Sequence, residues 1–274
     1  MWEQLLLPVL SLGALSFVFG AGLDLASKKF SVPQDENVDR IREVLPGANC
    51  GGCGQAGCDA FAEAVAAGKA PVNGCPVGGA SVAEKVAAIM GVEAQTEERK
   101  VARVLCQGDC DQASRQFEYK GIEDCIAACM TADGQKGCKY GCLGYGTCQR
   151  VCPFDAIHVN EKGLAVVDRD QCTACGKCVA VCPRNIIELI PASSAVQVAC
   201  HSRDNGREVR ANCKVGCIGC RICEKVCPSD AIIFENNLAK IDYRKCTECM
   251  KCAEKCPTGA IAVTPAQLPH AQVH

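Results

Sequence analysis

The chain has 274 residues, 26 of them cysteine, and a formal net charge of −2 at pH 7. Aromatic residues make up only 4% of the chain, which excludes one large conventional hydrophobic core and favours small modules held together by metal or cross-links. No nucleic-acid partner is expected of a chain with this charge balance. Because metal ligands are assembled only in the folded chain, the apoprotein is expected to be largely unfolded from about residue 135 onward.

Residues 1–26 are expected to form a membrane anchor. The run from Gln4 to Leu23 carries no charge and is long enough to span a bilayer as a helix. Lys28 and Lys29 follow it, and the positive-inside rule then places all the cysteines in the cytoplasm. The sequence thus predicts a single-pass protein of the cell (inner) membrane, with its cysteine domains on the cytoplasmic side. A cleaved signal peptide is the alternative, but no basic segment precedes the run.

Residues 35–92 are expected to form a small helical module with one [4Fe-4S] cluster. Helices are predicted from Asn37, as N-cap, to Leu45, over the alanine-rich stretch 59–69, and from the capping-box pattern Ser81-x-x-Glu84 to Gly91. Glycines between the first three cysteines let the backbone wrap closely around an inorganic core. Zinc is the alternative, because this spacing is less specific than a ferredoxin motif. The candidate ligands are Cys50, Cys53, Cys58 and Cys75.

The run C-x-x-C-x-x-C-x-x-x-C-P, typical of iron–sulfur ligation, occurs three times further along the chain. Its first three thiolates hold one cluster, and the fourth cysteine ligates the other cluster of a pair. Structural zinc sites use two separated pairs of ligands, and disulfide frameworks are typical of small secreted domains. The copies are Cys172-Cys175-Cys178-Cys182, Cys217-Cys220-Cys223-Cys227 and Cys246-Cys249-Cys252-Cys256, and an altered fourth copy contains Cys138, Cys142, Cys148 and Cys152.

Matching stretches about 75 residues apart predict two tandem bacterial-type two-cluster ferredoxin units, at 136–191 and 213–265. Each is expected to run cysteine triplet, short helix, strand, hairpin return and second triplet, so the fold class is α+β. Tyr145 stands where the second unit has Cys220, and Cys138 is the nearest thiol that could replace this ligand. With the module this makes five [4Fe-4S] clusters. The expected sets in the units are Cys138, Cys142, Cys148 and Cys182; Cys152, Cys172, Cys175 and Cys178; Cys217, Cys220, Cys223 and Cys256; and Cys227, Cys246, Cys249 and Cys252.

Six cysteines remain outside these sets, most of them in two connectors, 93–135 and 192–212; a tail covers 266–274. One interpretation is that they are small buried apolar side chains, which suits Cys125 and Cys129, one turn apart on an expected helix. At the repeat offset Cys125 aligns with Cys200. The other interpretation is a sixth cluster on Cys106, Cys110, Cys200 and Cys213. The six cysteines are Cys106, Cys110, Cys125, Cys129, Cys200 and Cys213.

The sequence contains no motif for a nicotinamide or a flavin. There is no G-x-G-x-x-G after an expected strand and no phosphate-binding loop, and the four histidines form neither a triad nor a metal-binding spacing. His158 is expected on a surface strand. The chain is therefore expected to relay electrons, with no catalytic residues of its own.

Four features of the chain together resemble the B-subunit family of the Rnf complex. They are the uncharged N-terminal run, the motif L-P-G-A-N-C-G-G-C-G-x-x-G-C ending at Cys58, the pair Cys75-Pro76 and the ferredoxin repeats. The resemblance covers nearly the whole chain. It implies a complex that couples electron transfer from reduced ferredoxin to NAD with sodium or proton pumping. It also implies that this chain accepts electrons from soluble ferredoxin and passes them to other membrane and flavin subunits. A stand-alone membrane-bound polyferredoxin serving another redox enzyme is the alternative.

The second ferredoxin unit is relatively basic, with eight lysines and arginines against six acids between Cys213 and Val263. The resemblance implies an acidic soluble ferredoxin as donor, and opposite charges steer association. The second unit is therefore expected to receive the electrons, with the four-cysteine module nearer the membrane partners. The basic residues beside its motifs are Arg221, Lys225, Lys245, Lys251 and Lys255.

Overall fold

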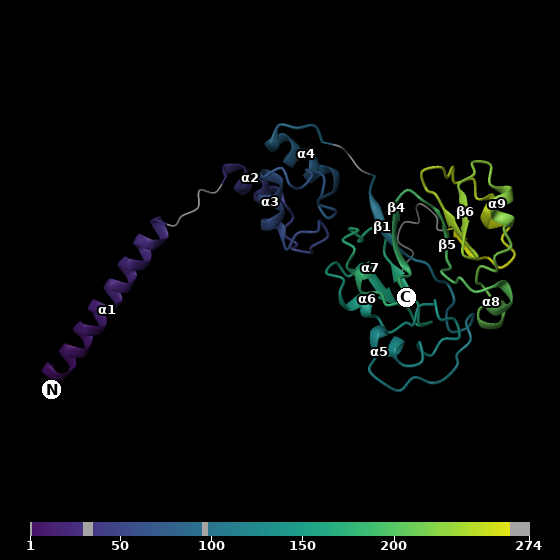
Figure 1. Ribbon diagram of the computed structural model, residues 1–274, viewed down its shortest axis with the longest axis horizontal. Helices are drawn as coiled ribbons and strands as arrows, with labels where there is room; N and C mark the ends of the chain where they lie inside the picture. Colours follow the sequence, from purple (N-terminus) through teal and green to yellow (C-terminus); the bar gives the residue numbers. More distant parts are fainter. Residues whose placement is uncertain (1, 30–34, 95–97, 264–274) are drawn as a thin grey trace.

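The computed structural model describes residues 2–29, 35–94 and 98–263. Helix α1 (Trp2–Lys29) stands apart from the other described elements (Figure 1). Its stretch Leu10–Ser27 is long and apolar enough to cross a membrane, with a mean hydropathy of 1.5, and 0% of it is buried against the protein. The uncharged run expected to be an anchor is therefore part of a long helix, whose stretch Leu10–Ser27 has no protein cover. The expected tail at 266–274 lies outside the described residues.

Three helices form the four-cysteine module: α2 (Glu36–Val44), α3 (Cys58–Ala66) and α4 (Gly79–Met90). They pack around the side chains of Ile41, Phe61 and Val86, which are almost completely buried. The first three cysteines lie in the loop between α2 and the start of α3, and the fourth lies between α3 and α4. The helices thus supply an apolar core of their own, with the cysteines at its edge.

Two helix starts in this module differ from the sequence-based expectation. The N-cap of α2 is Asp35, whose carboxylate accepts the Asn37 N–H at 3.0 Å, so the helix begins earlier than predicted. Helix α4 begins at Gly79, which puts Ser81 inside the first turn with its hydroxyl near the Gly78 carbonyl, so the predicted capping box does not form. Gly91 ends this helix at φ 67°, as expected of a glycine C-cap.

Both ferredoxin units have the expected α+β order of elements. In the first unit, α6 (Thr147–Arg150) leads to the hairpin of β2 (Ile157–Val159) and β3 (Ala165–Val167), then α7 (Lys177–Val181) and β4 (Ile187–Pro191). The second unit repeats this order with α9 (Ile222–Val226), β6 (Ile232–Glu235), β7 (Leu238–Ile241), α10 (Lys251–Glu254) and β8 (Ile261–Val263). Exposed His158 lies on β2, as predicted.

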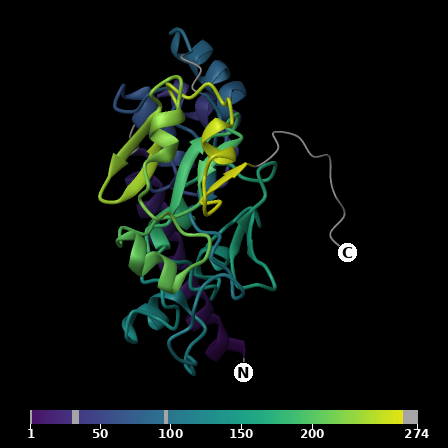
Figure 2. The same cartoon turned by 90° about the vertical axis from the view of Figure 1, so that its right-hand side faces the viewer.

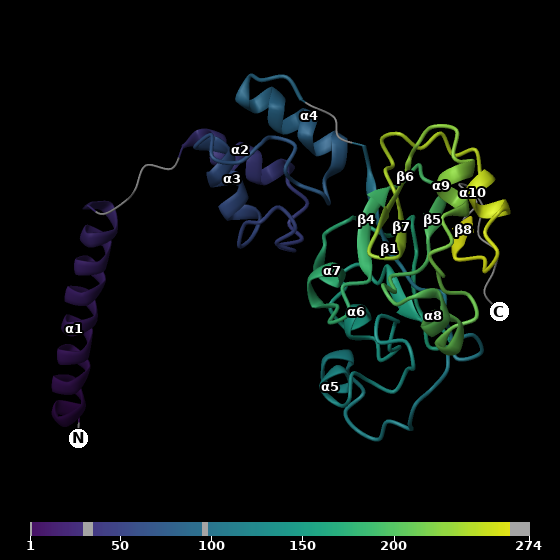
Figure 3. The same cartoon turned by 45° about the vertical axis from the view of Figure 1, so that its right-hand side comes forward.

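The connectors contribute strands that the sequence did not predict. Strand β1 (Lys100–Val104) pairs antiparallel with β4, and β5 (Val196–Val198) pairs antiparallel with β8 (Figure 3). The pairing extends one residue beyond each added strand. Leu105 N–H donates to the Ile186 carbonyl, and Ala199 N–H donates to the Ala260 carbonyl. The connectors also contain α5 (Cys125–Met130) and α8 (Gly206–Asn212). Each connector is thus part of the unit that follows it in the chain.

Thiols occupy the centre of both ferredoxin cores. Buried valine and isoleucine side chains of β1, β2 and β4 surround the cysteines of the first unit, and those of β5, β6 and β8 surround the cysteines of the second. Within residues 98–263, the second unit and the segment with α5 lie at opposite ends (Figure 2). The buried cysteines in the two cores are Cys142, Cys148, Cys172, Cys178, Cys200, Cys223 and Cys252.

Candidate iron–sulfur cluster sites

Three cavities in the ferredoxin units are each lined by four cysteines, three from one motif and one from its neighbour. Their empty volumes, counted to the mouth, are about 340, 350 and 320 Å³. These groupings coincide with three of the expected ligand sets. They are Cys152, Cys172, Cys175 and Cys178; Cys217, Cys220, Cys223 and Cys256; and Cys227, Cys246, Cys249 and Cys252.

A left-handed residue before each short helix turns the triplet around its cavity. Gly176, Arg221 and Met250 are the N-caps of α7, α9 and α10, with φ of 78°, 57° and 59°. The first two cysteines of each triplet lie in the loop before this residue, and the third lies in the first turn of the helix. The sharp turn brings the three sulfurs to one side of the backbone.

Each of the three cavities offers four thiols, the donor set of a [4Fe-4S] cluster. Zinc holds all its thiolates at about 2.3 Å from one centre. Within the described ranges, no group of three or more His, Cys, Asp or Glu side chains is arranged to hold one ion. Burial, reinforced by neighbouring thiols, raises the pKa of Cys178 and of Cys223 to about 11. Such thiols need nearby positive charge to become ligands, and iron supplies it.

The module gathers its four predicted ligands at the edge of its helical core. Cys53, Cys58 and Cys75 pack against that core. Burial raises the pKa of Cys75, and the charges of Cys58 and Cys50 contribute in the same direction. Backbone N–H groups already point at two of the sulfurs, since Gly52 N lies 3.5 Å from Cys50 Sγ and Gly78 N lies 3.4 Å from Cys75 Sγ. At Cys75 such a donor favours the thiolate form.

The module touches the first ferredoxin unit at its second cysteine set. A Cβ added at Gly52 would lie 2.9 Å from the Cys175 carbonyl oxygen, so only glycine allows this approach. Burial raises the pKa of Cys175, and Cys50 is the thiol that adds most to this effect. Cysteines of the module and of the first unit therefore adjoin one another.

The remaining set of the first unit gathers around Cys148. Burial raises the pKa of this thiol to about 12, and the neighbouring thiols that add to the shift include those of Cys142, Cys125 and Cys182. Cys125 is the first residue of α5. The structure thus brings a connector cysteine to the position beside Tyr145 where a ligand of the repeat is missing.

A hydrogen-bond network fixes α5 at this place. The Asp124 carboxylate caps the helix, accepts the Thr147 hydroxyl at 2.8 Å and pairs with Arg150 at 2.6 Å. The Cys125 N–H donates to the Thr147 hydroxyl oxygen at 2.8 Å. Because Thr147 and Arg150 belong to α6, beside Cys148, the network ties the connector helix to the triplet of the first unit.

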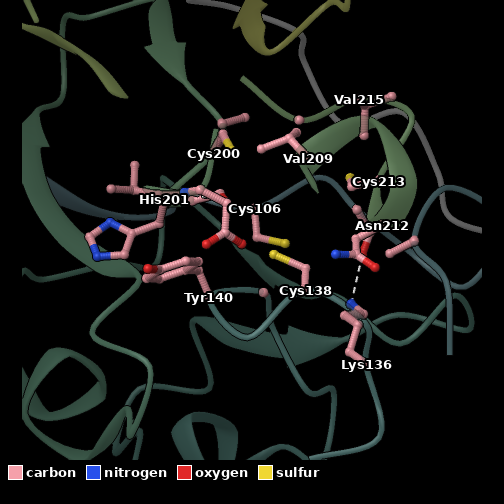
Figure 4. A pocket seen from close by; sticks show the side chains of 18 residues that line it. Cys106, Lys136, Cys138, Tyr140, Cys200, His201, Val209, Asn212, Cys213 and Val215 are labelled. Carbon is pink, nitrogen blue, oxygen red and sulfur yellow. Dashed lines mark hydrogen bonds between the residues drawn. The ribbon is translucent and has the colours of Figure 1, made fainter. Parts of the chain in front are cut away.

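Cys138, expected to replace the ligand lost at Tyr145, lies beside three other thiols in the structure. It lines a cavity of about 460 Å³ together with Cys106, Cys200 and Cys213 (Figure 4). The thiols that raise its pKa, after burial, are Cys106 and Cys213. Exposed Cys110, expected in the spare set, is not in this lining.

The repeat offset also misaligns the connector thiols. Cys200 corresponds in space to Cys106, because each follows its added strand by two positions and each sulfur accepts the N–H of the first triplet cysteine. These N···S distances are 3.4 Å for Cys142 to Cys106 and 3.3 Å for Cys217 to Cys200. The sequence signal that could have found them is a valine-rich run followed closely by cysteine.

Comparison with known proteins assigns the family. A model described as "Putative Fe-S cluster" matches residues 45–77, and models described as "4Fe-4S dicluster domain" match 138–189, 171–231 and 216–261. The B subunit of the Na⁺-translocating ferredoxin:NAD⁺ oxidoreductase complex of Acetobacterium woodii is 51% identical over 262 residues, which are 96% of this chain and 79% of that protein. The chain belongs to the B-subunit family of the Rnf complex.

Further B subunits of Rnf complexes have a similar likeness. The B subunit of the ion-translocating oxidoreductase complex of Methanosarcina acetivorans is 45% identical over 91% of this chain and 95% of its own length. The B subunit of the proton-translocating ferredoxin:NAD⁺ oxidoreductase complex of Clostridium ljungdahlii is 46% identical over 90% of this chain and 88% of its own length. The family and the 4Fe-4S character expected from the motifs are thus confirmed.

Proposed function

We propose that this chain is the membrane-anchored electron relay of an ion-translocating ferredoxin:NAD⁺ oxidoreductase. It accepts electrons from soluble ferredoxin and passes them to membrane and flavin subunits of the same complex. Helix α1 anchors it in the cell membrane, with the cysteine domains on the cytoplasmic side. The names of its relatives and its 4Fe-4S domains support this assignment.

Five [4Fe-4S] clusters are proposed for the module and the two units. Clusters of this kind supply one-electron transfer without a change in bonding at the protein. The cysteines hold and insulate them, and the surrounding backbone N–H groups tune their potentials. The proposed ligands are Cys50, Cys53, Cys58 and Cys75; Cys152, Cys172, Cys175 and Cys178; Cys125, Cys142, Cys148 and Cys182; Cys217, Cys220, Cys223 and Cys256; and Cys227, Cys246, Cys249 and Cys252.

The observation that carries the relay is the contiguity of the module with the two sets of the first unit. Gly52, between Cys50 and Cys53 of the module, closely approaches the backbone of Cys175, and Cys178 shares one buried core with Cys148. Among the described residues, the only exposed members of the proposed sets are Cys220 and Cys249, both in the second unit. This pattern supports electron uptake at the second unit and delivery at the module, which is next to the anchor in the chain.

The surface at the far end of the second unit suits an acidic donor. Lys245, Lys251 and Lys255 are exposed beside Cys249 and form no ion pair within the described residues. Unpaired lysines at a solvent-facing cluster site raise the rate of encounter with a negatively charged protein. We therefore place ferredoxin docking at these three lysines.

Replacing Lys245, Lys251 and Lys255 together by Gln is expected to slow reduction of the chain by ferredoxin several-fold at low salt and little at high salt. Stopped-flow mixing of the purified full chain with reduced soluble ferredoxin measures this rate. A variant with Lys69, Lys85 and Lys120 changed to Gln is the control for net charge. If ferredoxin fails to reduce the unaltered chain at any salt, the relay proposal is wrong; an unchanged low-salt rate in the variant moves the docking surface elsewhere.

Gly52→Ala is expected to slow electron passage between the first unit and the module. Its Cβ would meet the Cys175 backbone at 2.9 Å and 3.1 Å, so the two parts must move apart. Samples freeze-quenched at successive times after mixing with reduced ferredoxin measure the delay. This is the time between reduction of the clusters in the ferredoxin units and reduction of the cluster in the module. Gly54→Ala is the control, since that Cβ meets nothing within 4 Å although φ is +79°. An unchanged delay with full iron content would show that electrons do not use this contact.

A further inference from the structure

We propose that Cys106, Cys138, Cys200 and Cys213 hold a sixth [4Fe-4S] cluster that joins the two ferredoxin units. This inference deepens the relay proposed above and rests on it. It differs from the sequence-based alternative, because Cys138 takes the place of Cys110. The four side chains come from four separate segments of the chain and line one cavity between the units (Figure 4).

The cavity resembles the other cluster sites in size and lining. It encloses about 460 Å³, against 320 to 350 Å³ for the three four-cysteine cavities within the units. Gly108 lies between two of the thiols, since a Cβ there would be 3.0 Å from Cys213 Sγ and 3.9 Å from Cys106 Sγ. Four thiols therefore face one space, as in the three cavities within the units.

Each unit contributes an equivalent pair of cysteines. Cys106 and Cys200 each follow an added strand, β1 or β5, and accept a backbone N–H from the unit's own triplet. Cys138 and Cys213 each stand four positions before the first triplet cysteine, Cys142 or Cys217. Two matching pairs that meet at the boundary of two similar units are expected of a shared site. Unrelated buried thiols would not repeat in this way.

The walls of the cavity are fixed by contacts between the units. Ser114 N–H donates to the Asn212 carbonyl at 2.9 Å, and Lys214 N–H donates to the Gln112 carbonyl at 2.9 Å, one on each side of Cys213. Lys139 pairs with Asp204 at 3.3 Å across the same boundary. The four thiols therefore belong to one ordered arrangement.

A buried cation faces the thiols. Lys136 lines the cavity at only 8% exposure, and its ammonium donates to the carbonyls of Gly108 and Cys142, both at 2.6 Å. Among the described residues it forms no ion pair with a carboxylate. A buried charge without a counter-ion is costly, whereas a cluster with four thiolates is an anion. The lysine and the cluster would offset each other.

The position of this site fills a gap in the relay. Cys106 Sγ lies 3.4 Å from Cys142 N of the first unit, and Cys200 Sγ lies 3.3 Å from Cys217 N of the second unit. The cavity thus adjoins the nearest proposed set on each side. One electron at a time would pass from the second unit through this site to the first, with no bond formed or broken. Of the 26 cysteines, only Cys110 and Cys129 then remain without iron.

Iron and acid-labile sulfide in the anaerobically purified full chain test this proposal. The unaltered protein is expected to contain about 24 iron atoms per chain, against about 20 for five clusters. Cys213→Ala and Cys200→Ala are each expected to lose about 4 iron atoms, or about 1 with the paramagnetic signal of a three-iron cluster. Cys110→Ala and Cys129→Ala are the matched controls and keep full iron.

Several outcomes would overturn the proposal. The first is an iron content of about 20 atoms in the unaltered chain. The second is one zinc ion per chain in place of the missing cluster. The third is a full iron content in both cavity variants. The iron content of the unaltered chain is measured without any variant. The test therefore stays decisive even if a variant misfolds. Reduction by ferredoxin tests the relay separately. If the unaltered chain contains about 20 iron atoms and ferredoxin still reduces it, the sixth cluster is wrong and the proposed function stands.

Discussion

Removing the iron anaerobically from the full chain is expected to unfold both ferredoxin units. Every sheet in the described residues has only two strands, of three to five residues each. A two-stranded sheet is at best marginally stable by itself in water. The cores around these sheets contain cavities of about 320 to 460 Å³ lined by thiols, which iron and sulfide would fill. Without the clusters, little apolar contact remains to hold the strands together.

Hydrogen exchange followed by mass spectrometry measures this unfolding by segment. Protection is expected to collapse over residues 100–263 and to return when iron and sulfide are restored. The module provides an internal reference, because its helices pack around the buried side chains of Ile41, Phe61 and Val86. Retained protection of β1 and β5 in the iron-free chain would contradict the coupling of folding to cluster binding.

Cys125→Ala is expected to remove or convert one cluster, with a loss of about 4 iron atoms per chain or of about 1 if a three-iron cluster remains. The structure ties Cys125 to the triplet of the first unit through Asp124 and Thr147, and its charge acts on Cys148. Iron analysis and the reduced paramagnetic spectrum of the full chain measure the loss.

Cys129→Ala is the matched control for this experiment. It removes a thiol one turn further along the same helix, so helix propensity and thiol count change equally. Unchanged iron and spectrum are expected. If Cys125→Ala instead keeps its full iron content and spectrum, the fourth ligand beside Tyr145 is another residue, and the assignment of Cys125 is wrong.

The regular parts of the cysteine pattern were predictable from sequence because their ligands are local. Three of the four thiols of a ferredoxin set lie within seven residues, and the spacing C-x-x-C-x-x-C alone predicts a shared cavity around Cys172, Cys217 or Cys246. The cross-contributed fourth cysteine follows from the same motif. The three cavities described for these sets have the expected membership.

The connector thiols could not be assigned from sequence, because long-range strand pairing positions them. Cys106 and Cys138 are separated by the segment that contains α5, while Cys200 and Cys213 are separated by a much shorter one. A fixed repeat offset therefore aligned Cys200 with Cys125. Only the pairing of β1 with β4 and of β5 with β8 reveals that Cys106 is its counterpart.

The helix boundaries in the module were missed for a local reason. Asp35 and Asn37 are both good N-caps, and sequence alone does not say which carboxyl or amide oxygen reaches a free N–H. The start of α4 was missed in a similar way. Its N-cap is Gly78 and its first residue is Gly79, whereas the capping pattern predicts Ser81 as the N-cap. These errors moved helix starts by two or three residues and left the cysteine placement unchanged.

The exchange of cysteines between neighbouring motifs has a consequence for synthesis of the chain. The set around Cys148 lacks Cys182 until most of the first unit has left the ribosome, and the shared cavity lacks Cys213 for longer still. Helix α1 emerges before any of these thiols. A nascent chain that inserts early would thus present incomplete sites at the membrane surface, in a fixed order from the module outward. Iron can therefore complete the shared cavity only after the chain has been synthesised through Cys213.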